Sequence, residues 1–449
     1  MNAPQSKFRH RLRDTWLIVW GGLVGIGFGF VAEAQPNEDR LAKALSMARA
    51  SISAHYVEPV SPEKLQANLL KGLIGGLDPH SEYLTPAEVA EQKERLNSTY
   101  AGIGVTNDAQ ACIVKVFPGS PAELAGLQAR DCITAIDGRP TVDADEDEIV
   151  ARVRGKPGTL VFLQLQRDGK PIERAVLRAE IHAPTVESRL LKVADRQNVA
   201  VIKIDNFYAS TMDEVGKALD AALKDHLTVA ILLDLRDNPG GLIRSAVGVA
   251  SYFLPESATV VSLRGKDDSD NRVYRATKED WQLADACDET DWVAYLRGRH
   301  PQLANLPVAV LVNQFSASAS EVLVAALREH GRARIVGSQT FGKGSVQTML
   351  SLGEYGAARL TTARYYTPQE HSIQAVGIKP DVFVADAKVA AREADVPNHL
   401  ANEAGLHFGR KEALAQQRSQ AKGAIPVASS AIDLHVQAAL ADLGVNSRH

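Results

Sequence analysis

Nearly continuous apolar runs alternate with helix-spaced segments over the second half of the chain. The runs cover residues 199–204, 229–235, 308–312 and 334–336, and helical spacing is clearest over 212–223 and 242–253. Apolar runs of this length are typical of strands that are buried on both faces of a sheet. We therefore predict an α/β core over residues 183–385.

The pattern ahead of this core changes near residue 99. Residues 36–98 place leucines at helical spacing and predict a helical region, whereas residues 99–182 show short strands and tight turns. Inside the helical region, Pro79 fixes a turn. We interpret the neighbouring His80 as a hydrogen-bonding turn residue and not as a metal ligand or a base, because no second histidine stands at metal-binding spacing.

Two further segments interrupt or follow the core. Residues 265–301 are polar, and we expect a surface excursion with a short helix near Trp281 or Trp292. Residues 386–449 are rich in alanine, glutamine and charge, which predicts a helical tail broken at Pro397 and Pro426. This tail shows no recognisable chemistry.

The N-terminus predicts export. Four basic residues precede an uncharged, mostly apolar run over 16–31, and Ala32, Glu33 and Ala34 supply a small-x-small cleavage pattern; the basic residues are Lys7, Arg9, Arg11 and Arg13. Residues 1–34 are therefore a signal peptide or an uncleaved membrane anchor. In either case we expect the body of the protein in the periplasm, with the membrane reached only through an uncleaved N-terminal segment.

Composition narrows the function classes. A chain of 449 residues with 45% hydrophobic and 23% charged residues is a globular protein of several units. The net charge of −4 gives no reason to expect nucleic acid. The three cysteines Cys112, Cys132 and Cys287 form no metal-binding pattern, so we expect no metal and no cofactor. Cys112 and Cys132 would pair only in an oxidising compartment, and buried free thiols are the default expectation.

A serine cluster opens a helix directly after one of the apolar runs. Ser318 and Glu321 alone form a helix capping box, which is a structural feature of many proteins. The same position suits a nucleophile, because free N–H groups and the helix dipole favour negative charge there. In that case the N–H of Ala319 is a natural oxyanion donor. Ser316 and Ser320 flank Ser318, and spacing alone does not choose among the three serines.

A lysine between two glycines follows this helix. Residues 337–344 come within one residue of a phosphate-binding loop, but Gly344 stands where the magnesium-binding serine or threonine is needed, so we reject nucleotide binding. A buried lysine with a lowered pKa, here Lys343, can instead take the proton of a serine. The turn over 234–241, with Gly240 and Gly241, exposes backbone N–H groups that suit a second oxyanion donor, although an ordinary strand–helix turn has the same sequence.

The region 99–182 resembles a PDZ domain, and we call it the PDZ region. The resemblance rests on the succession of a glycine loop, a strand, a Gly-Ser-Pro-Ala helix start and an Asp-x-Ile strand. The loop residues Gly102, Ile103, Gly104 and Val105 would offer backbone N–H groups to a C-terminal carboxylate, while the peptide adds a strand to the sheet edge. Arg130 departs from the pattern, since a glycine usually precedes the aspartate.

Together these motifs resemble the C-terminal processing peptidases, which are tail-specific serine proteases with a Ser–Lys dyad and a PDZ domain. The matching segments fall in family order over residues 38–385. The resemblance implies an α/β multidomain protein with the PDZ domain inserted between an N-terminal helical segment and an α/β Ser–Lys protease core. By motif position Ser318 is the nucleophile and Lys343 is the base, and Gln347 helps to orient the lysine. The oxyanion donors are Ala319 and one of Gly240 or Gly241.

The chain also departs from the family pattern at three places. Ser338 stands where an acidic residue is usual, Gln369 and Glu370 replace a serine–glycine turn, and the excursion over 265–301 is longer than usual. None of these changes removes a catalytic group.

The resemblance further implies an exported endopeptidase that cuts proteins with unstructured, apolar C-terminal tails. It implies self-association through residues 36–98 into a dimer or a larger homo-oligomer, and it allows for a lipoprotein adaptor. The rival interpretation is a tail-binding scaffold or chaperone with an inert hydrolase core. The presence of Ser318, Lys343 and Gln347 together argues against that rival.

Overall fold

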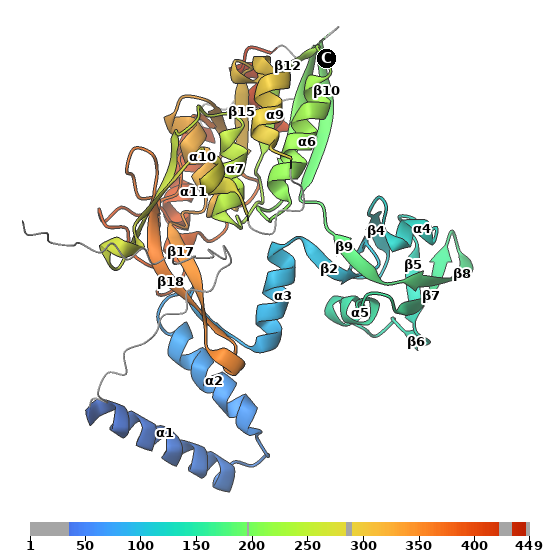
Figure 1. The fold of residues 1–449 in the computed structure, drawn as a ribbon, viewed down its shortest axis with the longest axis vertical. Helices are drawn as coiled ribbons and strands as arrows, with labels where there is room; N and C mark the ends of the chain where they lie inside the picture. Colours follow the sequence, from blue (N-terminus) through green and yellow to red (C-terminus); the bar gives the residue numbers. More distant parts are fainter. Residues whose placement is uncertain (1–35, 195–196, 284–289, 422–432, 446–449) are drawn as a thin grey trace, which may run out of the picture. The chain divides into compact units, whose positions relative to one another are not determined.

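The computed structural model describes most of the chain (Figure 1), namely residues 36–194, 197–283, 290–421 and 433–445. The predicted signal or anchor over residues 1–34 lies outside the described residues, as do Cys287 and Pro426. None of the described helices is long and apolar enough to cross a membrane. The chain divides into two compact units, residues 1–48 and 49–449. Helix α1 (Pro36–His55) carries the described part of the first unit.

The region 36–98 is helical, as predicted, but it also contains a strand. Helix α2 (Pro62–Gly75) begins after the Ser61 cap, and helix α3 (Pro86–Leu96) begins with a full capping box at Thr85. Between them, strand β1 (Glu82–Leu84) pairs antiparallel with strand β18 (Ala357–Tyr366). Because Tyr83 and Leu84 are buried, this strand ties the N-terminal region to a sheet of the core.

The PDZ region forms its own small core. Its strands are β2 (Thr99–Gly102), β3 (Val105–Asn107), β4 (Ile113–Val116), β5 (Cys132–Ile136), β6 (Arg139–Pro140), β7 (Leu160–Arg167), β8 (Lys170–Leu177) and β9 (Ala179–His182). Its helices are α4 (Pro121–Leu124) and α5 (Glu146–Val153). Strands β6, β5, β7 and β8 form one sheet in that order, and β2 with β9 and β3 with β4 form two pairs. Their inward-facing side chains, such as Ile113 and Leu163, are 1% exposed.

A disulfide joins Cys112 and Cys132, so the default expectation of free buried thiols is wrong for this pair. The reason is strand geometry. The two residues face each other across an antiparallel bridge and are only half-buried, so their sulfurs meet without displacing core side chains. Arg130, the residue that replaces the usual glycine, takes the left-handed conformation that glycine would favour, with a φ of 75°.

The predicted α/β core is confirmed by a six-stranded sheet in the order β10, β11, β12, β15, β16, β19. The strands are β10 (Val186–Ala194), β11 (Gln197–Ile204), β12 (Thr228–Asp234), β15 (Val308–Val312), β16 (Arg334–Gly337) and β19 (Val382–Phe383). All neighbours are parallel except β10 and β11. Alternate side chains of β11 enter two separate clusters, Ile202 on one face and Val201 on the other, as expected for strands buried on both sides.

Helices cover both faces of this sheet. Helices α6 (Thr211–Leu223), α7 (Ile243–Ser251) and α10 (Ala319–Glu329) contribute to the larger cluster. Helix α12 (Leu434–Asp442) covers the opposite face with Val436, Ala439 and Leu440. The C-terminal tail is therefore part of the core.

A second sheet carries strands β1, β18, β13 and β14 in that order, and β17 also pairs with β18. The strands added here are β13 (Thr259–Gly265), β14 (Arg272–Arg275) and β17 (Ser345–Ser351). In Figure 1, β17 and β18 form a long hairpin.

The polar segment 265–301 is less superficial than expected. It forms two helices, α8 (Lys278–Trp281) and α9 (Trp292–Arg299), and places Trp281 and Leu296 in the main cluster. The imidazole of the following His300 lies 2.9 Å from the buried Asp220.

The predicted helical tail is correct only in its later part. Helix α11 (Arg410–Ala421) and helix α12 are present, but the described residues 386–409 hold only a short 3-10 turn at Glu393–Asp395. Arg392 and Glu393 are buried there, at 2% and 0% exposure. No sequence pattern indicated these two buried charges, and they show that this part of the tail packs into the interior.

Candidate active site

Ser318 occupies a strained turn between strand β15 and helix α10. Its φ is 57° and its ψ is −117°, a conformation that side-chain-bearing residues rarely adopt. It directly precedes the first residue of the helix, Ala319, and its side chain is only partly buried. A serine on such a turn after a buried strand presents its hydroxyl outward, next to the positive end of the helix.

The two neighbouring serines have structural hydrogen bonds instead. Ser316 and Ser320 are fully buried. The Ser316 hydroxyl donates to the carbonyl oxygen of Leu235 at 2.8 Å, and the Ser320 hydroxyl donates to that of Asn238 at 3.0 Å. These bonds tie the serine turn to the turn over 234–241, and of the three serines they leave Ser318 as the partly exposed one.

The glycine turn lies against Ser318. A side-chain carbon added to Gly240 would come within 2.8 Å of the Ser318 Cβ, so only glycine fits there. The N–H of Gly240 already donates to the Asn238 side-chain oxygen at 2.8 Å. By contrast, the N–H groups of Gly241 and Ala319 have no hydrogen-bond partner among the described residues. These two N–H groups are therefore available to a substrate oxygen.

Lys343 lies in the loop between β16 and β17, and burial is the main cause that lowers its pKa. The Arg359 guanidinium lowers this pKa further, whereas the carboxylates of Glu393, Asp78 and Glu321 raise it. Within the described residues, the Lys343 ammonium makes no hydrogen bond to the Ser318 hydroxyl. Catalytic hydrogen bonds often form only when substrate binds, so the missing hydrogen bond is compatible with a Ser318–Lys343 pair.

Glu321 connects the serine turn to the lysine loop, a role that the sequence did not reveal beyond its place in a capping box. One carboxylate oxygen accepts the N–H of Ser318 at 2.9 Å and that of Lys343 at 3.0 Å. The other accepts the Thr340 hydroxyl at 2.5 Å and the Gly342 N–H at 2.8 Å. Complete burial raises the pKa of Glu321 to about 7, and the four hydrogen bonds oppose that rise.

Tyr365 on β18 is a second residue without an assigned role in the sequence. Its side chain is 2% exposed, and its hydroxyl donates to the Lys343 carbonyl oxygen. Burial raises the pKa of Tyr365 well above its usual value, whereas a hydrogen bond with the Ser318 side chain lowers it. Tyr365 therefore contacts both halves of the site. Tyr365 lies within the span 38–385 that resembles the family, but no spacing rule distinguishes it from Tyr366.

Gln347 lies two residues beyond Ser345 on β17. Its amide donates to the Ser345 hydroxyl at 3.0 Å and to the Thr361 hydroxyl at 3.1 Å. Thr361 in turn donates to the buried Asp78 carboxylate at 3.1 Å. No hydrogen bond joins Gln347 to Lys343 in the described part of the chain, so its orienting role stays a prediction.

Ser338, one of the departures from the family pattern, has an acidic partner from elsewhere in the chain. Its hydroxyl donates to the Asp386 carboxylate at 2.6 Å. A carboxylate is thus present at this place, although it comes from the tail and not from position 338.

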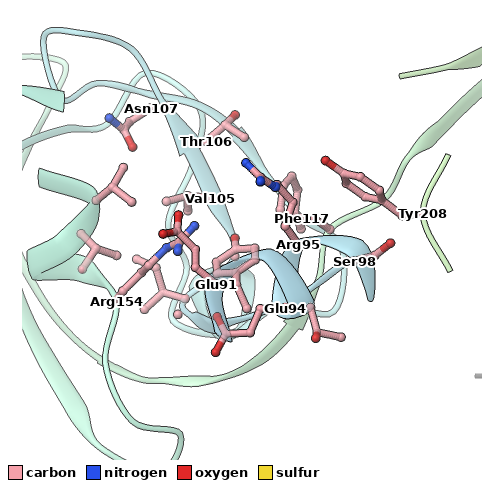
Figure 2. Close-up of a pocket in the computed structure, with 18 of the residues that line it drawn as sticks. Glu91, Glu94, Arg95, Ser98, Val105, Thr106, Asn107, Phe117, Arg154 and Tyr208 are labelled. Carbon is pink, nitrogen blue, oxygen red and sulfur yellow. The ribbon is translucent and has the colours of Figure 1, made fainter. Parts of the chain in front are cut away.

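The loop of the PDZ region borders a cavity of about 370 Å³ (Figure 2). Gly102, Ile103, Gly104 and Val105 all line it, together with Phe117 and residues of helices α3 and α5. The N–H groups of Ile103 and Gly104 have no hydrogen-bond partner among the described residues. Open N–H groups beside an apolar hollow suit a peptide carboxylate with an apolar last side chain.

Charged side chains surround the same cavity. Arg95 and Arg154 supply positive charge, and Glu91, Glu94 and Glu146 supply negative charge; Figure 2 labels Arg95, Arg154, Glu91 and Glu94. Three carboxylates stand against two guanidinium groups, so the open N–H groups, and not these charges, favour a chain-terminal carboxylate.

Two family models match this chain. The model of peptidase family S41 matches residues 198–384, and the model of the PDZ domain matches residues 113–167. The described residues therefore combine a peptide-binding domain with a peptidase core, which defines a PDZ-bearing serine protease.

Curated relatives extend the match beyond the domains. The chain is 34% identical over 345 residues to a carboxy-terminal-processing protease of Bartonella bacilliformis, covering 74% of this chain and 72% of that one. It is also 34% identical over 353 residues to a CtpA-like serine protease of Staphylococcus haemolyticus, covering 78% and 66%. The chain thus spans about two thirds of the length of these relatives. It belongs to the carboxy-terminal-processing serine proteases of peptidase family S41, and the predicted family is confirmed.

Among solved structures, the photosystem II D1 C-terminal processing protease is similar over 79% of this chain and 95% of that one. The sequence identity is 23% and the TM-score is 0.43.

Proposed function

We propose that this chain is an endopeptidase in which Ser318 attacks the peptide carbonyl and Lys343 takes its proton. The observation that carries this proposal is that the three serines differ in burial and in hydrogen bonding. Ser316 and Ser320 are buried and donate to backbone carbonyl oxygens, while Ser318 sits partly exposed on a strained turn. A nucleophile needs a reachable hydroxyl, and of these three serines only Ser318 supplies one.

The reaction follows from the surrounding groups. Burial and Arg359 lower the pKa of Lys343, which favours the neutral amine that a general base requires. The Ser318 oxygen bonds to the carbonyl carbon, and its proton passes to the Lys343 amine. The lysine then gives that proton to the departing amine as the peptide bond breaks. Water then gives a proton to the same lysine and bonds to the acyl carbon, the bond from that carbon to the Ser318 oxygen breaks, and the lysine returns the proton to the Ser318 oxygen.

The oxyanion of the tetrahedral intermediate needs two donors close to Ser318. We assign the N–H of Ala319 and that of Gly241, since the N–H of Gly240 is already donated to Asn238. Gly240 then serves by its shape, because any side chain there would strike Ser318.

The substrate class is proposed from the PDZ domain. Its open N–H groups and apolar hollow suit the C-terminus of an unstructured tail, and the resemblance implies that this domain presents the tail to the peptidase core. Self-association through residues 36–98 and a lipoprotein adaptor belong to the same proposal.

Export to the periplasm is proposed as well. It is supported by the basic and apolar pattern of residues 1–34 and by the disulfide between Cys112 and Cys132, which persists in oxidising compartments. A fusion of residues 1–40 to a reporter enzyme that is active only outside the cytoplasm tests this proposal. An inactive reporter would contradict it.

The enzymatic proposal is tested by incubating the chain without residues 1–34 with an unstructured protein that ends in an apolar tail. Mass spectrometry of the products locates the cut bonds. We expect cleavage by the wild type and none by Ser318→Ala. Binding without cleavage by the wild type would favour the rival scaffold, and equal cleavage by Ser318→Ala would refute the assigned nucleophile.

A further inference from the structure

A buried carboxylate lies beyond the residues that match the peptidase family. Glu393 is 0% exposed, and its two oxygens are held by side chains from distant parts of the chain. His80, in the turn before β1, places its ring nitrogen 2.8 Å from one oxygen, and Gln374 donates its amide to the other at 2.9 Å. The peptidase match ends at residue 384.

The same segment holds the loop that carries Lys343. The N–H of Glu393 donates to the Phe341 carbonyl oxygen at 3.3 Å. The neighbouring Arg392 donates its guanidinium to the Thr340 carbonyl oxygen at 2.5 Å. Two consecutive residues of the tail therefore bind the backbone just ahead of the lysine.

Gln374 completes this arrangement on the other side of the lysine. Its side-chain oxygen accepts the N–H of Gly344 at 2.9 Å, while its amide donates to Glu393. One glutamine thus links the residue after Lys343 to the buried carboxylate. The loop is held at three positions, and Glu393 takes part at both ends.

Burying the Glu393 carboxylate reduces the stability of the fold, which suggests a functional reason for keeping it. A carboxylate without solvent loses several kcal/mol of hydration, and an apolar residue of similar size would fill the space at less cost. Among the described residues Glu393 contacts His80 and forms no ion pair with a lysine or arginine. Its charge nevertheless acts on Lys343 and on Tyr365.

We propose that Glu393 is a positioning residue for Lys343. Its carboxylate, fixed by His80 and Gln374, helps to hold the loop that bears the general base. This inference rests on the proposed Ser–Lys reaction and adds the tail to the active site. It also assigns a role to the turn at His80, because the His80 side chain contacts one oxygen of the Glu393 carboxylate.

The test is Glu393→Gln, which keeps the shape and removes the charge. We expect turnover to fall by about ten- to a hundredfold, with little change in KM, because a neutral amide binds Gln374 and His80 more weakly than the carboxylate does and so loosens the link through Gln374 to Gly344. Because Glu393 raises the pKa of Lys343, its loss should also move the rising limb of the pH–rate profile to lower pH. The other groups acting on Lys343, namely Arg359, Asp78 and Glu321, stay unchanged. Glu393→Asp keeps the charge and should restore the wild-type midpoint.

The matched control is Asp395→Asn on the same 3-10 turn. Asp395 is exposed and accepts the N–H groups of Arg392 and Arg410, at 2.9 and 2.7 Å. Its loss loosens the segment without changing the charge among the groups acting on Lys343, so the pH midpoint should stay in place. A Glu393→Gln midpoint that equals the wild-type midpoint, or unchanged turnover, would overturn the proposal.

A second readout separates this inference from the proposed function. A fluorophosphonate bonds its phosphorus to the Ser318 oxygen, releases fluoride and leaves the serine proton with the base, so it needs no peptide substrate. No labelling of the wild type would refute the Ser–Lys proposal itself. Labelling of the wild type, together with an identical pH dependence in Glu393→Gln, would refute the positioning role alone.

Discussion

The peptidase core and the PDZ domain treat polar groups in opposite ways. In the core, the carboxylates near the candidate dyad are buried, and Glu321 accepts four hydrogen bonds from two different segments. In the PDZ domain, the N–H groups of Ile103 and Gly104 stay open beside a cavity, and charged side chains surround it.

The difference reflects what each region must do. A general base needs a fixed environment of low polarity, because only there does its pKa move far from the usual value. A peptide site needs hydrogen-bonding capacity that the protein has not used, since the ligand supplies the partner. The two regions should therefore respond differently to substitution, with turnover controlled by the core and tail affinity by the PDZ domain.

The largest effect is expected at Lys343. Lys343→Ala should lower turnover by roughly a hundred- to ten-thousandfold, the usual contribution of a general base, and leave KM nearly unchanged. Lys343→Arg should be as inactive, because a guanidinium does not give up its proton at ordinary pH. Steady-state cleavage of a tail-bearing protein measures both constants. An active Lys343→Arg enzyme would mean that another group is the base.

Glu321 offers a pH-dependent test of the buried core. Its folded pKa of about 7 lies above the ordinary value of 4.5, so between these values the folded state binds the proton more tightly than the unfolded state. The contribution of Glu321 to the free energy of unfolding is present in full below about pH 4.5 and is lost as pH rises toward 7. The expected loss is roughly 3 kcal/mol. Urea unfolding at about pH 4.5 and about pH 8 should show this loss in the wild type and not in Glu321→Gln.

Glu88 provides the matched control for that measurement. It closes the capping box of helix α3 as Glu321 does at α10, accepting the Thr85 N–H at 2.7 Å, but its side chain is only partly buried, with 41% exposure. Hydrogen bonds lower the pKa of Glu88, so its contribution is present above the unfolded pKa and has the opposite sign. If Glu88→Gln removed the same pH dependence as Glu321→Gln, burial would not be its cause.

The disulfide tests whether the two regions are independent. Replacing both Cys112 and Cys132 by serine removes a link across 20 residues, which should destabilise the PDZ domain by roughly 3 kcal/mol. Amide hydrogen exchange should then speed up within the PDZ domain and stay unchanged in strands β12 and β15. Cys287→Ser controls for the loss of a thiol. Equally faster exchange in the peptidase core would show that the two regions unfold together.

Much of the fold could be predicted because most of its strands and helices are determined by residues that are close in sequence. The apolar runs of the core appear as strands β11, β12, β15 and β16, and the Gly-Ser-Pro-Ala segment of the PDZ region begins helix α4. Strand β1 escaped prediction, because a three-residue strand between helices is stabilised by its partner β18 and not by its own sequence.

The candidate site was predictable only as far as its motifs extend. Ser318 and Lys343 stand in recognisable segments, and Glu321 was visible as a cap. Glu393 and its link to His80 span 313 residues of sequence, and no periodicity or spacing rule connects positions so far apart. The disulfide was missed for a related reason, since pairing depends on which strands face each other.

The smallest predicted effect concerns the PDZ loop alone. A methyl group added at Gly104 would lie 2.3 Å from the Ser120 Cβ, so Gly104→Ala should displace the loop and raise KM for tail substrates about tenfold, near 1.4 kcal/mol. Turnover at saturating substrate should not change. Gly119→Ala is the matched control, because its φ of 73° is close to the 84° of Gly104 and its added methyl meets nothing within 4 Å. Anisotropy of a labelled tail peptide, with its C-terminal amide as the non-binding form, reports affinity directly. A fall in turnover without a change in affinity would show that this loop acts on the chemistry, and the division between the two regions would fail.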